Sequence, residues 1–408
     1  MQKIINTFTA LFATLSLMAA LFVPFMSDTI FVNGAKGVSR FYKMYDDQAS
    51  WEARKELLIG ETLDVFKLDL DKAREAPTGK TAYAPKTLVT ESGIIIERLY
   101  VETIPGYYLC ANIYVSADPA VNTEPMPLVM LAHGHFDDGW DNRDRFFEDS
   151  QYFGAAFAQR GFLVVAWDMV GLGDDRIDTK NSILTHETKY NTVIQTWNSM
   201  KLLSYVLSDR FTTESSYKAD PRYVVATGAS GGGTQAIYMS ALDDRVTASI
   251  PVVMVSAIFN GDSKCENGIN ALWTCKVHSN ICERIACFAP KPLLVISDSN
   301  DWTRLNPQVE YPYLQYVYGF YDAKEKMENF HDADGVHDYS LLKRQKALDF
   351  LLRMWDLPKN GLYDKPYTAD NYTLRPVADL MTFSASSGLQ RPAGYSTCNK
   401  ELYDRVIG

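Results

Sequence analysis

The chain has 408 residues, of which 47% are hydrophobic and 22% charged, and this ordinary balance excludes a wholly disordered protein. Its 40 Lys and Arg and 50 Asp and Glu residues give a net charge of -10, which repels phosphate backbones and argues against a nucleic-acid partner. The 24 Tyr, 20 Phe and 7 Trp residues fit a well-filled core and leave ring faces to bind sugars or other flat ligands.

The first segment of the chain is strongly apolar. Residues 8–26 carry no charge, Lys3 precedes them, and polar residues follow from Ser27. This pattern predicts an export segment over residues 1–35, which acts as a cleaved signal peptide or as an N-terminal membrane anchor. A buried core helix is the alternative. We expect the protein to be secreted or periplasmic, or held at the membrane by this segment.

The region before the main domain begins with a helix and continues with strands. Apolar residues recur at helical spacing over residues 50–68, so residues 36–86 are predicted to form a helical lead-in. Residues 87–116 are rich in β-branched and aromatic side chains and are interrupted at Ser92-Gly93 and Pro105-Gly106. This predicts antiparallel strands joined by turns.

From Pro127 onward, short apolar runs alternate with longer segments of helical periodicity. Strands are predicted at 127–134, 162–169, 223–230, 248–255 and 292–298, with a last strand near 326–332. Helices are predicted at 150–161, 191–208, 232–242, 309–321 and 340–355. The alternation indicates a doubly wound α/β domain over residues 87–358, followed by an accessory tail at 359–408 that packs on it.

A glycine-rich turn follows the predicted strand 223–230. Gly228-Ala229-Ser230-Gly231-Gly232 matches G-x-S-x-G between a strand and a helix. Such a turn exposes a serine hydroxyl at the strand end, and the following amide, here Gly231, can donate to an oxyanion. A phosphate-binding loop is the alternative interpretation of this turn, but no Lys follows the glycines as the GxxxxGK[ST] motif requires.

A serine nucleophile needs a histidine base and an acid, which follow it in the chain when the nucleophile stands on this kind of turn. Of the three histidines after Ser230, His337 lies in a loop before the last helix and is favoured over His331. His278 is interpreted as structural. For the acid, Asp301 lies deeper in the loop after strand 292–298 than Asp298, and it is favoured for reaching the histidine.

The loop after strand 127–134 is expected to supply a second oxyanion donor, the backbone amide of His135 or Phe136. A zinc site made of His133, His135 and nearby aspartates is the alternative, because two histidines at i and i+2 with carboxylates can bind a metal.

Six cysteines lie at positions 110, 265, 275, 282, 287 and 398. Four of them fall between 265 and 287, without the C-x2-C pairs of common zinc sites. For an exported chain these spacings favour disulfides in this region, and buried free thiols are the alternative.

Together these motifs resemble the α/β-hydrolase superfamily, and within it the acetyl xylan esterase-like branch. The resemblance covers about Gly93 to Trp355 and rests on IPGYYLCANIYVS, HGH, AWDMVGLGDD (166–175), GASGGG, NDWT, VEYPY and GVHDYS. It implies an α/β-hydrolase fold with a mostly parallel sheet, an antiparallel N-terminal strand pair, and a triad of Ser230, Asp301 and His337. Glucuronoyl esterases are relatives whose nucleophile is typically followed by Arg, where this chain has Gly231.

The resemblance also implies a secreted serine esterase that acts on acylated carbohydrate through an acyl-enzyme, and such an enzyme needs no metal or organic cofactor. Trp302, Trp140 and Trp273 are candidate sugar-stacking rings, and the Cys-rich insert at 258–287 is expected near the pocket. The alternatives are a peptidase of the prolyl oligopeptidase type, for which the about 90 residues before the sheet are too few to form a propeller, and a non-enzymatic binding member of the fold.

Overall fold

The computed structural model describes residues 38–122, 125–135, 144–176, 181–258, 263–267, 278–357 and 372–408. The predicted export segment lies outside these ranges. No helix within them is long and apolar enough to cross a membrane.

Ten strands form one twisted sheet in the order β1-β3-β4-β6-β5-β7-β8-β9-β10, with β2 paired to β3. From β6 to β10 all neighbours are parallel, whereas β1, β2 and β4 pair antiparallel with β3, and β4 also pairs antiparallel with β6. The strands are β1 (Thr81–Tyr83), β2 (Leu88–Val89), β3 (Ile94–Ile104), β4 (Tyr107–Ser116), β5 (Met126–Ala132), β6 (Leu163–Trp167), β7 (Ala219–Ala229), β8 (Ala248–Val252), β9 (Leu293–Asp298) and β10 (Met327–Asp332).

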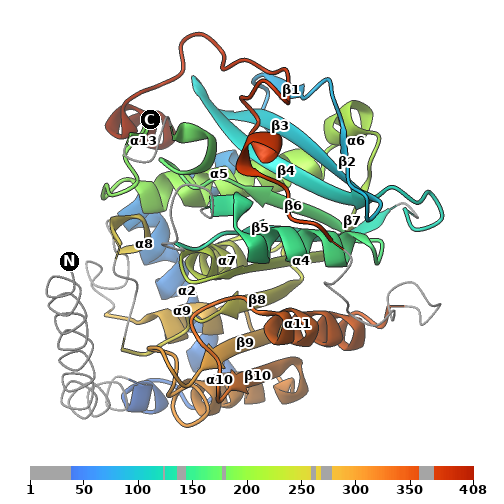
Figure 1. The fold of residues 1–408 in the computed structure, drawn as a ribbon. Coiled ribbons are helices and arrows are strands. Elements are labelled where there is room, and N and C mark those ends of the chain that lie inside the picture. The colour runs from blue at the N-terminus through green and yellow to red at the C-terminus, as the bar shows by residue number, and fades with distance from the viewer. Residues whose placement is uncertain are drawn as a thin grey trace, which may run out of the picture.

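Helices cover both faces of this sheet (Figure 1). One face is covered by α4 and α11, and the other by α5, α7, α9 and α10. The α-helices are α2 (Gln48–Phe66), α3 (Leu70–Arg74), α4 (Glu148–Ala158), α5 (Asn191–Val206), α6 (Asp209–Ser215), α7 (Gly231–Leu242), α8 (Lys264–Asn267), α9 (Ile281–Ala286), α10 (Glu310–Gly319), α11 (Leu341–Met354), α12 (Val377–Leu380) and α13 (Asn399–Ile407).

The two hydrophobic cores show why the apolar runs become central strands. In β5, Leu128 and Met130 join the core under α5 and α7, while Val129 and Leu131 join the core under α4 and α11. Because successive side chains of a strand point to opposite faces, a strand buried on both faces must be apolar at every position.

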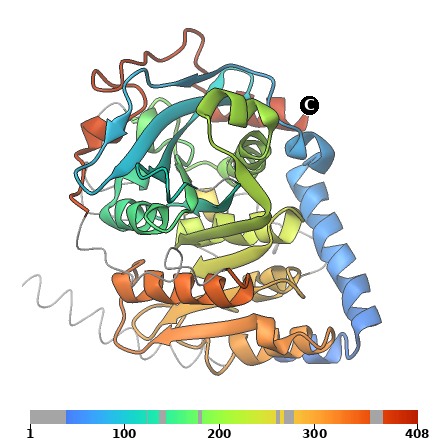
Figure 2. The same cartoon turned by 90° about the vertical axis from the view of Figure 1, so that its right-hand side faces the viewer.

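Helix α2 lies outside the helical layer and runs along one side of the molecule (Figure 2). Its start is fixed by Asp47, whose carboxylate accepts a 2.8 Å hydrogen bond from the Ser50 amide. Arg54 forms a buried ion pair of 2.7 Å with Glu283 of α9, and the Phe66 ring packs on Tyr238 of α7. The lead-in is therefore docked on the main domain.

The C-terminal tail is anchored by a buried charge cluster. Arg145 pairs with Asp168 and Asp174, and the Asp174 carboxylate also accepts hydrogen bonds of 2.9 and 2.8 Å from the Thr382 and Phe383 amides. Further along, the ring centroids of Tyr403 in α13 and Tyr190 lie 5.0 Å apart.

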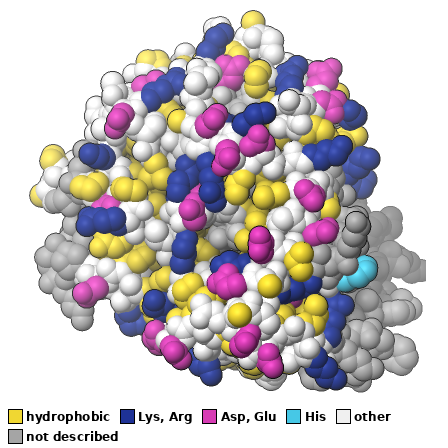
Figure 3. All heavy atoms as spheres, turned by 180° about the vertical axis from the view of Figure 1, so that it is seen from behind, with side chains coloured by type: hydrophobic (Ala, Val, Ile, Leu, Met, Phe, Trp, Pro, Cys, Tyr) yellow, Lys and Arg dark blue, Asp and Glu magenta, His cyan; other side chains and the backbone are white. Residues whose placement is uncertain are grey.

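On the face opposite to that in Figure 1, acidic and basic side chains are interspersed (Figure 3).

The predicted α/β architecture is confirmed. Each of the strands predicted from residue 127 onward corresponds to one of β5–β10, and each predicted helix to α4, α5, α7, α10 or α11. The predicted turn at Pro105-Gly106 joins β3 to β4, and Gly106 has a φ of 78° that a side chain would strain. Strand β1, which lies within the predicted helical lead-in, and helices α6, α8, α9, α12 and α13 were not predicted.

The disulfides predicted for the Cys-rich region do not form among the cysteines that the structure describes. Cys110, Cys265, Cys282, Cys287 and Cys398 form no disulfide, and Cys275 lies outside the described residues. Cys282 and Cys287 are buried in the core around α9, where the Cys287 thiol contacts the Glu283 carbonyl of its own helix. Burial raises the pKa of both thiols. These residues act as small core side chains.

Candidate active site

Ser230 stands on a strained turn between β7 and α7. Its φ of 56° and ψ of -122° are uncommon for a residue with a side chain, and its amide donates to the Val252 carbonyl at 3.0 Å. A Cβ at Gly228 or Gly232 would come within 2.3 or 2.2 Å of the Ala132 carbonyl oxygen. Only glycine therefore allows this turn to lie so close to the end of β5.

His337 and Asp301 form a hydrogen-bonded pair. Nδ1 of His337 lies 2.9 Å from Oδ2 of Asp301. The other oxygen of Asp301 accepts bonds of 2.6 Å from the Thr303 amide and 2.5 Å from its hydroxyl. The carboxylate is almost fully buried, with 3% of the side chain exposed, whereas 26% of the His337 side chain is exposed. Asp301 therefore holds the ring in one orientation while Nε2 stays free of it.

The Asp and His residues that the sequence analysis did not favour make other contacts. Asp298 forms a 2.7 Å ion pair with the buried Lys343, and burial raises the pKa of Asp298 to about 6. His331 lies on β10 with one ring nitrogen 2.9 Å from the Ser297 hydroxyl and the other 3.0 Å from the Ser299 hydroxyl. His278 belongs to another region, where its carbonyl accepts a bond from Arg40.

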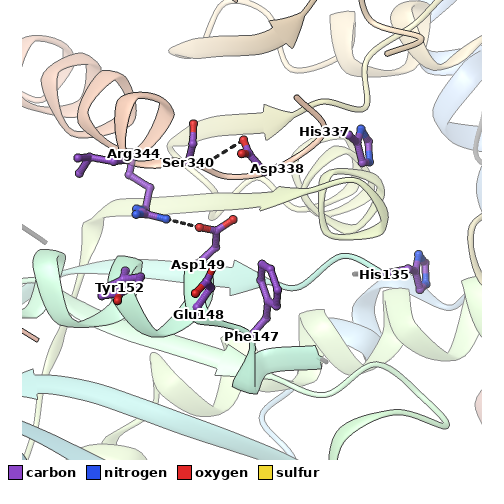
Figure 4. Close-up of a pocket in the computed structure, with 10 residues that line it drawn as sticks. His135, Phe147, Glu148, Asp149, Tyr152, His337, Asp338, Ser340 and Arg344 are labelled. Atoms are coloured by element: carbon purple, nitrogen blue, oxygen red, sulfur yellow. Dashed lines mark hydrogen bonds and ion pairs between the residues drawn. The ribbon is translucent and has the colours of Figure 1, made fainter. Parts of the chain in front are cut away.

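The sheet topology brings the predicted triad to one edge. Ser230, Asp301 and His337 follow β7, β9 and β10, which are parallel, so their carboxyl ends meet at the same edge. A cavity of about 550 Å³ lies there, and His135 and His337 line one end of it (Figure 4). The His135 ring is next to the nucleophile turn, because a Cβ at Gly231 would lie 2.6 Å from its Cε1.

The predicted oxyanion hole is described in part. Gly231 is the first residue of α7, where backbone amides have no partner within the helix, and this suits a donor. Phe136 lies outside the described residues, so the second donor stays a prediction.

Solved structures resemble this chain over most of its length. Methylesterase BT1017 superposes with a TM-score of 0.76 at 29% identity, covering 91% of this chain and 78% of its own. A glucuronoyl esterase of carbohydrate esterase family 15 from Caldicellulosiruptor kristjansonii gives 0.50 at 16% identity, covering 83% and 93%. A Bacteroides fragilis protein provisionally described as an acetyl xylan esterase gives 0.50 at 12%, covering 70% and 76%.

The chain has the fold of the α/β-hydrolase superfamily. No protein-family model matches it, and no curated protein matches its sequence. In this α/β-hydrolase the antiparallel β3–β4 pair precedes the parallel strands, as the sequence predicted.

The cavity of the hydrolase is lined mainly by polar and charged groups. Arg344 of α11 pairs with Asp149 of α4 across it, and Glu148 and Asp338 add negative charge. Trp302 lies against His337, with the two ring centroids 4.3 Å apart, so this predicted stacking ring packs on the Asp301–His337 pair. The other two predicted stacking rings, Trp140 and Trp273, lie outside the described residues.

The structure does not support a zinc site built on His133. This side chain is buried, its Nε2 accepts a 3.0 Å bond from the Met169 amide, and its Nδ1 faces the Gly134 carbonyl at 2.9 Å. Both ring nitrogens are thus occupied by backbone groups. Burial lowers the pKa of His133 to about 4, which keeps the ring neutral.

Some groups at the site could not be found from the sequence. His186 approaches His135 from the loop before α5, Cys265 approaches it from α8, and Lys343 holds the loop that carries His337. None belongs to a motif. His186 and Cys265 lie 51 and 130 positions from His135, and Lys343 lies 45 positions from its partner Asp298. Only the tertiary structure places them at the site.

Proposed function

We propose that the protein is a serine carboxylic-ester hydrolase that acts on esterified carbohydrate. The observation that carries this proposal is the Asp301–His337 hydrogen bond at the sheet edge where the strained Ser230 turn lies. A buried carboxylate that orients a half-buried histidine near a serine on such a turn suits general-base activation of the hydroxyl.

The proposed reaction has two steps. His337 Nε2 takes the proton of Ser230 Oγ as this oxygen attacks the ester carbonyl, and the amide of Gly231 with one from the loop after β5 stabilises the oxyanion. The protonated His337 then gives its proton to the leaving alcohol. Water, activated by the same histidine, releases the acid and regenerates Ser230.

Two kinds of ester are candidates for the substrate. The motifs of the chain resemble enzymes that remove acetyl groups from carbohydrate. The 29% identity with a methylesterase over 91% of the chain favours a methyl ester of a sugar carboxylate. Both esters are neutral, so the Glu148 carboxylate in the cavity lining repels neither of them, while Asp149 and Asp338 are paired with Arg344 and Lys343.

A product assay separates these candidates. The protein is incubated with acetylated xylan, with methyl-esterified uronate polysaccharide and with a peptide panel, and released acetate, methanol and amines are measured. We expect acetate or methanol, and no release by Ser230→Ala. Amine release without ester turnover would favour the peptidase alternative, and no turnover on any substrate would favour the binding alternative. Turnover that survives in Ser230→Ala would contradict the proposed nucleophile.

A further inference from the structure

Three side chains with metal-binding atoms converge beside the nucleophile turn. His135 follows β5, His186 lies in the loop before α5, and Cys265 is in α8. Nε2 of His135 lies 2.6 Å from Nε2 of His186 and 3.2 Å from Sγ of Cys265, and the three atoms lie within 4.8 Å of one another. The cluster is separate from the Asp301–His337 pair.

The tautomer of His186 leaves a lone pair directed into this cluster. Its Nδ1 lies 2.7 Å from the Val170 carbonyl, which can only accept, so Nδ1 carries the hydrogen and Nε2 does not. A histidine whose second nitrogen donates to a backbone carbonyl is the usual arrangement of a metal ligand in proteins.

The segments that carry the three residues are joined to one another. The Asn191 side chain donates to the His186 carbonyl at 2.5 Å, and the Lys264 amide donates to the Glu187 carboxylate at 3.1 Å. Glu266 of α8 accepts a bond of 3.3 Å from the Thr234 hydroxyl of α7. The ligand atoms are therefore held near one another by the fold itself.

We propose that His135, His186 and Cys265 bind a divalent cation of borderline softness, with Zn²⁺ as the best match. Imidazole nitrogens and thiolates are both zinc ligands, and a set of three protein ligands leaves a fourth position for water. In a tetrahedral site such nitrogens lie about 3.3 Å apart, so the rings need to separate by less than about 1 Å. Binding releases the proton of the Cys265 thiol.

This cation site has a direct structural link to the esterase site. The His135 ring that would bind the ion also packs on Gly231, so the ion would fix the ring beside the proposed oxyanion donor. The ion has no step in the proposed ester hydrolysis. The site can therefore be tested by binding alone, and its failure would leave the esterase proposal standing.

The test uses the full chain without a histidine tag. Zn²⁺ binding is measured by competition with a chromophoric chelator, and Co²⁺ is added separately as a spectroscopic probe. We expect one ion per chain and a near-ultraviolet thiolate-to-cobalt charge-transfer band. Cys265→Ser should abolish this band, and His186→Asn should weaken Zn²⁺ binding at least about tenfold. Cys398→Ser and His331→Gln are the matched controls and should bind as the unaltered protein does, as should Ser230→Ala.

Two results would overturn the proposal. One is the absence of saturable binding at one ion per chain, and the other is a charge-transfer band that persists in Cys265→Ser. Circular dichroism establishes that each variant is folded. If a variant does not fold, the Co²⁺ spectrum of the unaltered protein decides the matter, because a spectrum without a thiolate band contradicts ligation by Cys265.

Discussion

At the scale of single residues, the contacts of Asp301 define its role. One carboxylate oxygen accepts from His337, and the other accepts twice from Thr303, so the Thr303 bonds fix the carboxylate and the carboxylate fixes the histidine ring. In the proposed reaction, this carboxylate sets the tautomer of His337 and stabilises the imidazolium that would form during acyl transfer. The neighbouring Asp298 is bound to Lys343 and does neither.

Replacing this carboxylate tests the role. Asp301→Asn keeps the shape but presents an amide to Nδ1, so we expect kcat on an activated ester to fall by about 10⁴-fold with the melting temperature little changed. Asp334→Asn, an exposed position before the same histidine, is the control and should retain the original kcat. Equal activity of the two variants would remove Asp301 from the mechanism.

Sequence reasoning at this scale proposed Ser230, His337 and, by preference, Asp301 from motif and chain order, and the structure pairs His337 with Asp301. It could choose between Asp298 and Asp301 only by their depth in the loop. Asp298 is not the partner of His337 because its carboxylate is bonded to the ammonium group of Lys343, more than forty positions away. No local pattern contains that information.

At the scale of elements, the loop between β10 and α11 is held by one buried side chain. Nζ of Lys343, the third residue of α11, donates to Asp298 at 2.7 Å, to the Val336 carbonyl at 2.6 Å and to Asp338. The bonded residues Val336 and Asp338 stand directly before and after His337 in the sequence. The proposed base, His337, therefore lies on a loop that is bonded to both β9 and α11.

Lys343→Met removes this tie and leaves Asp298 buried without its partner. We expect a loss of about 3–5 kcal/mol in the free energy of unfolding, measured in urea, and a fall in kcat larger than the change in KM. Lys346→Met on the exposed side of α11 should change stability by no more than about 0.5 kcal/mol. If both substitutions had the same small effect, the loop would not depend on Lys343.

The elements themselves followed closely from sequence periodicity, because central strands buried on both faces are apolar throughout, as β5 and β6 are. The sequence pattern did not predict helix α13. Its buried residues Leu402, Tyr403 and Val406 are spaced as expected for a helix, but the segment is short and follows a proline-rich tail. Its order comes from docking, with Asn399 bonded to Asn191 of α5.

At the scale of the whole molecule, stability depends on pH through buried acids. Glu310, at the start of α10, has one oxygen bonded to the Ala257 amide at 2.7 Å, and burial raises its pKa to about 7 from an ordinary value of 4.5. The folded state therefore keeps its proton where the unfolded chain has lost it. The stability this provides is complete below about pH 4.5 and is lost as pH rises through about 7.

Glu310→Gln isolates this contribution, because the amide keeps the acceptor but cannot ionise. Between pH 5 and pH 8 we expect the unaltered protein to lose about 3 kcal/mol of unfolding free energy relative to the variant. Urea unfolding of both proteins at several pH values measures the difference. If the unfolding free energies of the two proteins change equally with pH, Glu310 does not have the raised pKa in the folded state that its burial predicts.

The central claim is that Ser230 is the nucleophile of an acyl-transfer site, and covalent labelling tests it most directly. The folded protein is treated with a fluorophosphonate, its intact mass is measured, and the modified residue is located by peptide mapping. We predict one adduct per chain, on Ser230, formed far more slowly in His337→Ala. An adduct on another residue, or ester hydrolysis that continues while Ser230 stays unmodified, would contradict the account.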